Sequence, residues 1–384
     1  MTHSSAIPVL YFHSVAPAPD PNWYKSKLTV STRIFEQLLK YYSSHHYSFL
    51  CLDEYAELNN AMSTNTKAIC LTFDDGYLDN FVHVFPLLKR YNAKATIFVS
   101  PEYVDPAEIV RPTMEDVWNG KCLVSDLESS GFLSWAEMRL MESSGLVDIQ
   151  SHTMTHTKVF RDSTIRDFHN PGADWLYPIG NLFPERKPFY ITDAVFPNLL
   201  PYGTPFFTES SALVTRRVSI NLSFNQECIS ILEGTDWRNY SFSHAMSVVK
   251  KLYNKYTENG TLVDGTESVA DYQTRVRDEI IRSKAIIEEK LSKEVKHICW
   301  PHGDYNQFCI DTAFGSGYRS VHAVPGKGPV PDRSFTRIGV TELKTMKFLS
   351  SVRTVFKTEA QRGAFPFSTV ANMYSKFRSL VKKR

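Results

Sequence analysis

Two short clusters of acidic and histidine residues in this 384-residue chain have the spacing of a catalytic site. The first is Asp74-Asp75-Gly76, which directly follows the apolar run 67–73. Adjacent residues at a strand end point in different directions, so one carboxylate can bind a metal while the other accepts a proton from water. A simple Asp-Gly turn is the alternative, because this triplet alone is not specific.

The second cluster is SHTMTH, residues 151–156, which follows a predicted strand at 147–150. Because His152 and His156 are four residues apart, one helical turn would place both imidazoles on the same side. Imidazole suits zinc and similar divalent metals. Two loop histidines are the alternative, but both clusters follow strands, and ligands of α/β folds gather at the carboxyl ends of strands. Asp75, His152 and His156 therefore predict an open catalytic metal site.

The elements that must position these clusters follow from the apolar pattern. We expect buried strands at 7–12, 47–52, 67–73, 94–99, 147–150, 295–300 and 333–340, with helices between most of them. The succession of strand, helix and strand over residues 67–99 indicates a right-handed βαβ unit. A capping box at Ser134 to Glu137 opens one helix, and a long helix is expected at 269–291.

Residues 160–270 interrupt this alternation. They are rich in Pro, Tyr, Phe and Asn, and they are too long for a bare loop. We therefore expect a barrel over residues 1–340, interrupted by an insertion or cap subdomain at 160–270, and a helical tail at 341–384. The basic end, 374–384, is expected to be a frayed tail, with weak contact to an anionic membrane surface as the alternative.

Composition narrows the class of protein. A net charge of +2 gives no reason to expect nucleic-acid binding. The six cysteines form no CxxC pair, so they are expected to be free thiols. Neither a signal peptide nor a long apolar segment is recognisable, and we therefore expect a cytoplasmic location.

Together, TFDDG and the H-[ST]-x-x-H element resemble the polysaccharide deacetylase (NodB-homology) family. The resemblance implies an α/β fold, a distorted (β/α) barrel of the polysaccharide deacetylase type, and hydrolysis of acetamido groups on sugars. It also implies that Asp74 is the general base. Asp75, His152 and His156 would then hold the metal, which is usually zinc; cobalt, nickel and manganese are the alternatives.

Two further segments are similar to the poly-N-acetylglucosamine deacetylase branch of this family. In PVLYFHSV, residues 8–15, His13 matches a histidine thought to serve as general acid, and the absence of a late LxxH element favours the same residue. CWPHGDYN, residues 299–306, resembles an aromatic-Pro-Tyr-Gly element that walls the site and offers a backbone N–H to the oxyanion. Trp300, Pro301 and His302 are therefore expected to form this wall, with His302 in place of the usual Tyr and Trp300 stacked on the sugar.

The expected function is removal of N-acetyl groups from an acetamido sugar or glycan during synthesis of a cell-surface polysaccharide. A cytoplasmic location favours a lipid-linked or nucleotide-linked sugar as substrate. One alternative is hydrolysis of another non-peptide carbon–nitrogen bond, such as a simple amide, because a fold does not determine its function. A second alternative is a non-catalytic glycan-binding protein on the same fold.

Overall fold

A nine-stranded sheet forms the centre of the molecule. The structure is a computed structural model that describes residues 7–21, 23, 25–60, 67–172, 176–322, 331, 333–343, 349–364 and 366–371. The strands are all parallel and follow the order β14-β13-β12-β7-β6-β5-β1-β15, with β4 beside β5. Their bounds are β1 (Val9–Phe12), β4 (Ser48–Leu50), β5 (Ala68–Phe73), β6 (Ala95–Val99), β7 (Val147–Ser151), β12 (His297–Cys299), β13 (Ser320–His322), β14 (Ser334–Phe335) and β15 (Ile338–Gly339).

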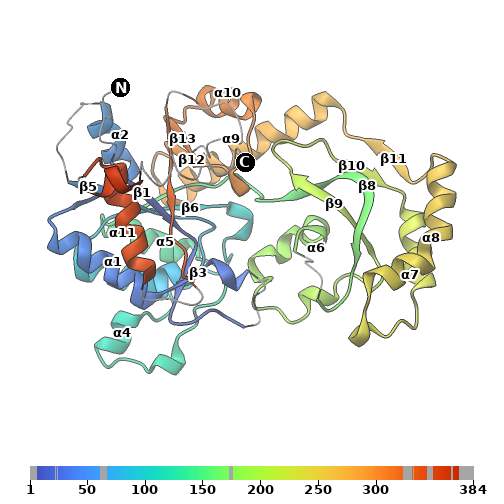
Figure 1. Ribbon diagram of the computed structural model, residues 1–384, viewed down its shortest axis with the longest axis horizontal. Helices are drawn as coiled ribbons and strands as arrows, with labels where there is room; N and C mark the ends of the chain where they lie inside the picture. Colours follow the sequence, from blue (N-terminus) through green and yellow to red (C-terminus); the bar gives the residue numbers. More distant parts are fainter. Residues whose placement is uncertain are drawn as a thin grey trace.

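The sheet curls with helices packed around it, which confirms the predicted α/β fold with a distorted (β/α) barrel (Figure 1). Every residue of β5 and β6 is buried, as expected for parallel strands that are covered on both faces. The surrounding helices are α1 (Thr32–Ser44), α2 (Leu52–Asn60), α3 (Phe85–Tyr91), α5 (Trp135–Ser143), α9 (Val269–Leu291) and α10 (Gln307–Gly315).

The predicted βαβ unit forms between β5 and β6. The connection begins as a π-helical turn at Asn80–Val84, continues as α3, and ends at Asn92, whose φ of 45° is left-handed. The predicted capping box of α5 is also present: the Ser134 hydroxyl accepts a hydrogen bond from the Glu137 backbone N–H, and the Glu137 side chain accepts one from Ser134. Local sequence signals therefore determine both segments.

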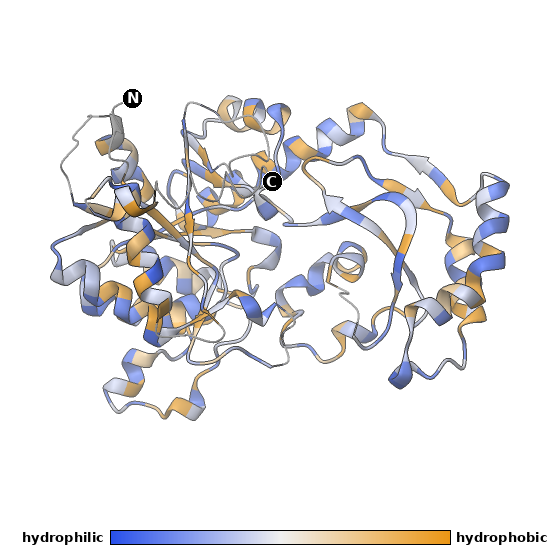
Figure 2. Cartoon of the chain, viewed as in Figure 1, coloured by the Kyte–Doolittle hydropathy of each residue, from blue (hydrophilic) through white to orange (hydrophobic). Residues whose placement is uncertain are grey.

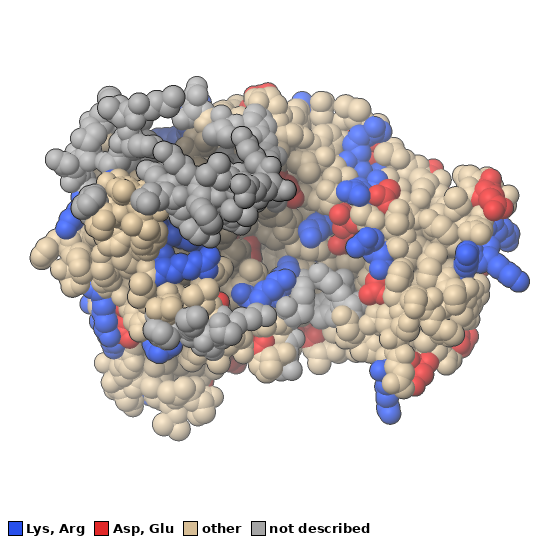
Figure 3. All heavy atoms as spheres, viewed as in Figure 1, with Lys and Arg blue, Asp and Glu red and all other residues tan. Residues whose placement is uncertain are grey.

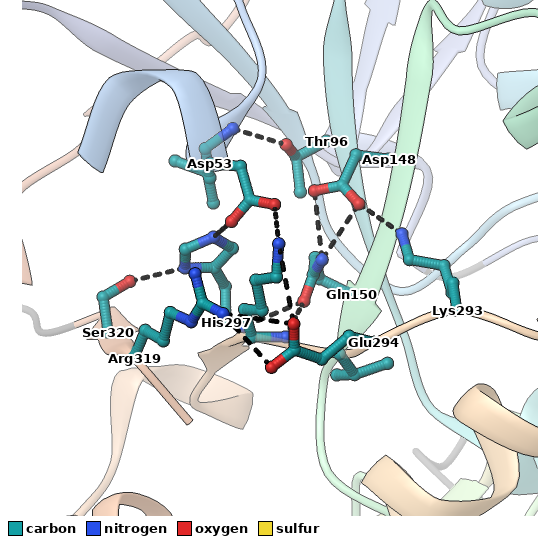
Figure 4. A network of polar contacts seen from close by, with 12 residues as sticks. Asp53, Thr96, Asp148, Gln150, Lys293, Glu294, His297, Arg319 and Ser320 are labelled. Carbon is teal, nitrogen blue, oxygen red and sulfur yellow. Dashed lines mark hydrogen bonds and ion pairs between the residues drawn. The ribbon is translucent and has the colours of Figure 1, made fainter. Parts of the chain in front are cut away.

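A buried polar network ties the sheet together at the amino ends of β12 and β13 (Figure 4). His297 lies between the carboxylate of Asp53, at 2.9 Å, and the hydroxyl of Ser320, at 2.7 Å. The Gln150 side-chain oxygen accepts hydrogen bonds from the backbone N–H groups of Lys296 and His297, which joins β7 to β12. His297 is fully buried. This Asp–His–Ser chain therefore stabilises strands and is closed to a substrate, unlike a nucleophilic triad.

Green and yellow elements to the right of the barrel in Figure 1 form a second hydrophobic core, which includes Phe168, Phe207, Phe224 and Val249. Apolar residues of its two long helices turn inward, toward the paired strands (Figure 2). Its elements are β8 (Lys158–Phe168), β9 (Pro205–Ser211), β10 (Val218–Ile220), α7 (Leu222–Ile231), α8 (Phe242–Glu258) and β11 (Val263–Thr266). Helix α6 (Leu176–Leu182) lies in the same stretch of chain but packs into another apolar cluster, with Tyr77 and Tyr103. We call residues 158–266 the insertion, and the division of the chain into domains stays a proposal.

Helix α11 (Leu349–Gln361) packs against α1, where the hydroxyls of Tyr42 and Thr358 lie 2.9 Å apart. The basic segment 374–384 falls outside the described residues, so its contact with a membrane stays a prediction. All six cysteines are unpaired, as predicted. Among the described helices, none has the length and apolar character needed to cross a bilayer.

Candidate active site

The turn after β5 places two carboxylates in different directions. Asp75 and Gly76 both have left-handed backbones, with φ of 72° and 68°. A Cβ atom on residue 76 would lie 2.8 Å from Cγ1 of Val99, on the neighbouring strand β6. Only glycine fits this approach without strain, so Gly76 permits the sharp turn that presents Asp75.

Asp75, His152 and His156 converge at the carboxyl ends of β5 and β7. Oδ1 of Asp75 lies 3.3 Å from Nε2 of His152 and 3.3 Å from Nε2 of His156. The same Oδ1 atom is buried and has no hydrogen-bond partner among the residues that the structure describes. One carboxylate oxygen and two imidazole nitrogens within 4.8 Å of one another are a donor set that fits a divalent metal with a further position open. The structure thus brings together all three residues predicted as ligands.

The histidines converge by a different backbone from the predicted one. Residues 152–157 form no helical turn, and Thr153 and His156 have left-handed φ values of 62° and 42°. The expectation of a helical turn was therefore wrong. Nδ1 of His152 donates to the backbone oxygen of Cys299 at 2.8 Å, which leaves Nε2 free to bind a metal.

Helix α9 and the insertion fix the segment between His152 and His156 through hydrogen bonds. Glu279, on α9, accepts hydrogen bonds from the backbone N–H and the hydroxyl of Thr155. Nζ of Lys187, from the insertion, pairs with Glu102 and donates to the Thr155 backbone oxygen at 3.3 Å. The Lys187 side chain is only 2% exposed, and a Cβ on Gly180 would lie 3.1 Å from its stem. Such a buried, fully paired lysine fixes the turn that carries His156.

Asp74 is paired with an arginine that the sequence did not predict. Nη1 of Arg337 lies 2.6 Å from one carboxylate oxygen of Asp74, and Nη2 lies 2.8 Å from the other. Both side chains are 6% exposed. Burial by itself would raise the pKa of Asp74, but the Arg337 guanidinium outweighs it and lowers the pKa to about 2. Asp74 is therefore ionised at neutral pH, as a proton acceptor must be.

His13, the predicted general acid, lies on the other side of Asp74. It follows β1, and its Nε2 atom is 4.0 Å from Oδ2 of Asp74. Its side chain is 24% exposed, so a ligand can approach it. Asn80 donates a hydrogen bond to the His13 backbone oxygen at 3.0 Å, which helps to fix the segment. The predicted general acid and general base therefore lie next to each other.

Only one of the three residues predicted to wall the site, His302, lies beside the ligand cluster. His302 lies with its ring 4.6 Å from the ring of His156, and its own backbone is left-handed, with φ of 59°. Burial and the neighbouring His156 lower the pKa of His302 well below its usual value, so this histidine is neutral. Trp300 is 1% exposed and stacks on Tyr305 in the barrel core, and Pro301 is buried. The expectation that Trp300 stacks on a sugar was therefore wrong, because the strand register turns it inward.

A small aromatic pocket adjoins the ligand cluster. Asp75 and His156 form part of its lining, with Tyr77, Tyr103, Phe132 and Tyr190 around them. The Tyr103 ring stands edge-on to His156, with the ring centroids 6.1 Å apart. A small pocket with aromatic walls suits a methyl group better than a sugar ring. These aromatic residues, like Arg337 and Lys187, are site residues that sequence reasoning missed.

Comparison with known proteins tests the family that was predicted from the sequence. Residues 61–169 match the family model described as polysaccharide deacetylase. A Bacillus subtilis (strain 168) protein, YxkH, which is named among the polysaccharide deacetylases, is 33% identical over 94 residues, 24% of this chain and 31% of that protein. The poly-beta-1,6-N-acetyl-D-glucosamine N-deacetylase of Escherichia coli (strain K12) is 34% identical over 87 residues, 23% of this chain and 12% of that protein. The chain matches less than a third of either relative.

One solved structure extends the likeness to the whole fold. It is of a de-N-acetylase from Aggregatibacter actinomycetemcomitans, with a TM-score of 0.51 and 21% identity over 86% of this chain and 94% of that chain. The predicted barrel of the polysaccharide deacetylase type is thereby confirmed. TFDDG and the two histidines, on which the predicted family rests, both lie inside residues 61–169, the segment that matches the polysaccharide deacetylase model.

Proposed function

We propose, starting from the polysaccharide deacetylase domain that this chain carries, that it is a metal-dependent hydrolase of N-acetyl groups. The substrate would be an acetamido sugar or glycan used in cell-surface polysaccharide synthesis. One observation carries the proposal: a buried, unpartnered oxygen of Asp75 faces the Nε2 atoms of two histidines, directly beside the ionised Asp74. The cytoplasmic location stays a prediction.

Asp75, His152 and His156 would hold the metal, with zinc first and cobalt, nickel or manganese as alternatives. A divalent ion in such a site acidifies water and polarises a carbonyl oxygen. Asp74 then accepts the proton of the water that attacks the acetyl carbon. Arg337 keeps Asp74 ionised and oriented for this step through its two hydrogen bonds.

Two further groups complete the hydrolysis. The backbone N–H of His302 would donate to the oxyanion of the tetrahedral intermediate. His13 would donate a proton to the sugar nitrogen as the carbon–nitrogen bond breaks, which releases acetate and a free amine. The acetyl methyl group would enter the pocket lined by Tyr103 and Phe132. A base with a low pKa and an acid of a different chemical type suit these opposite roles.

Acetate release tests this proposal. N-acetylated monosaccharides, β-linked N-acetylglucosamine oligomers, nucleotide-linked N-acetylhexosamines and simple acetamides would be offered to chelator-treated protein and to the same protein after addition of zinc. We expect release from at least one acetamido sugar that chelation abolishes and zinc restores. Release from simple acetamides alone would favour the other carbon–nitrogen hydrolases. Glycan binding without turnover in the metal-loaded protein would favour the non-catalytic alternative.

A further inference from the structure

A large groove lies between helix α9 and the insertion, with a volume of about 490 Å³. This volume is typical of ligand sites, which span ~300–1,000 Å³. In the space-filling view, Lys, Arg, Asp and Glu side chains gather around the hollow between the barrel and the insertion (Figure 3). We call this cavity the insertion groove. Its lining includes Thr155, Phe160, Leu182, Phe206, Asp278 and Arg282.

One wall of the insertion groove is a charged face of α9. Arg275, Asp278, Glu279 and Arg282 follow the spacing of a single helical face and all line the groove. Arg275 is held by Glu267, and Glu279 is held by Thr155. Asp278 and Arg282 are exposed, and neither side chain has a hydrogen bond or ion pair within the described part of the chain. Their acceptor and donor groups are available to a ligand.

The opposite wall is largely apolar. Phe160 is partly exposed there, and the largely buried Phe206 also lines the groove. Leu182, at the end of α6, is 64% exposed and adds to this apolar side. A ligand in this groove therefore has one apolar side and one side that hydrogen-bonds to charged groups.

Charge in the groove excludes most ionic ligands. Positive and negative side chains are interspersed in its lining, which holds Lys187, Arg217, Arg275 and Arg282 together with Glu102, Asp278 and Glu279. A strongly anionic nucleotide or lipid diphosphate would face three carboxylates, and a cationic ligand would face the basic groups. A neutral ligand with an apolar face and several hydroxyl groups satisfies both walls. Carbohydrate has this chemistry, since its hydroxyls both donate and accept while its ring carbons stack on aromatic side chains.

We propose that the insertion groove is a second carbohydrate-binding site, separate from the metal cluster. Helix α6 lies between the two: its Leu176 lines the pocket of Asp75 and His156, whereas Pro178 and Leu182 line the groove. The groove also reaches Thr155, so its occupant lies behind the turn that carries His156. The site would hold a second stretch of a glycan chain, which favours an oligomeric or polymeric substrate. It stands whether or not the metal cluster hydrolyses amides.

Calorimetric titration of the full chain with β-1,6-linked and β-1,4-linked N-acetylglucosamine oligomers, from the monomer to the hexamer, tests the proposal. The titration would use Asp75→Ala protein, in which the metal cluster is disrupted. We expect an oligomer to bind with an affinity that rises with chain length. Replacing Asp278 and Arg282 by alanine should weaken this binding by about ten-fold or more, because two hydrogen bonds to charged groups are lost.

The matched control replaces Glu289 and Lys290, two exposed charges on α9 outside the groove, and should bind oligomers like the parent. Acetate release from a monosaccharide should be equal in the Asp278→Ala/Arg282→Ala variant and in wild-type protein. The proposal fails if no oligomer binds Asp75→Ala protein, or if both pairs of substitutions affect binding equally. Preferential binding of a fatty acid or a nucleotide sugar in the groove would overturn it as well. Absence of acetate release from the zinc-loaded wild-type protein, with oligomer binding to the Asp75→Ala protein intact, would overturn only the proposed function.

Discussion

Replacing Arg337 with methionine should show how much the ionisation of Asp74 and the stability of the fold depend on this buried ion pair. In the wild-type protein, Asp74 receives two hydrogen bonds from Arg337 and has a pKa of about 2. Methionine keeps the apolar stem but removes both donors and the positive charge. Removing one member of a buried ion pair costs about 3–5 kcal/mol, because the remaining charge is left uncompensated. The free energy of unfolding should fall by an amount in this range.

The same substitution should change the pH dependence of catalysis. Because the folded-state pKa of Asp74 lies below its ordinary value of 3.8, its ionisation stabilises the protein above about pH 4, and this contribution is lost as the pH falls toward 2. Without Arg337, burial dominates and the pKa of Asp74 rises. The acidic limb of the kcat/KM profile should therefore move to higher pH. At neutral pH kcat/KM should fall by about 10–100-fold, part of the usual contribution of a general base.

The assay is urea unfolding together with acetate release measured from pH 4 to 9. Arg362→Met is the matched control, because Arg362 also bonds a carboxylate, Glu359, and a tyrosine, but lies in the α11 region. It should lose stability without moving the acidic limb. Arg337→Lys keeps one charge and should give an intermediate result. An unchanged acidic limb in both Arg337 variants would refute the claim that this ion pair sets the ionisation of Asp74.

The remaining predictions concern the residues around the metal cluster. Lys187→Met should weaken zinc binding by about ten-fold in a competition titration, because the turn before His156 loses its anchor; unchanged affinity would make Lys187 a purely structural residue of the insertion. Gly76→Ala should lower the free energy of unfolding by about 2 kcal/mol or more, since its left-handed backbone and the contact with Val99 leave no room for a Cβ; a neutral effect on urea unfolding would contradict the strained turn. His13→Ala should lower kcat by about 100-fold at constant metal content, and loss of metal would instead make His13 a ligand.

The residues of the cluster could be predicted because each motif follows a strand. Apolar runs identify β5 and β7, and parallel strands bring their carboxyl ends to the same edge of the sheet. The edge at which these strands end does not depend on the loops, and Asp75, His152 and His156 do lie together there. The loop backbone was less predictable. The spacing of four between the histidines matched a helical turn, whereas left-handed residues produce the observed convergence.

Arg337 and Lys187 could not be found from the sequence. Arg337 is separated from Asp74 by 263 positions, and no local pattern distinguishes it from a surface arginine. Lys187 lies in a short 3-10 helix, Pro184–Phe189, where a charged residue normally indicates exposure, yet it is buried. The prediction for Trp300 was wrong for the opposite reason. Its motif suggested contact with a ligand, but the three-residue strand β12 turns its side chain into the core. Such placements depend on long-range packing.

Metal content and acetate release, measured together on wild-type, Asp74→Asn and Asp75→Ala protein, test the central claim most directly. The account predicts about one equivalent of zinc and full activity in the wild type, bound zinc without activity in Asp74→Asn, and loss of both in Asp75→Ala. Near-full turnover by Asp74→Asn, or stoichiometric zinc in Asp75→Ala, would contradict it.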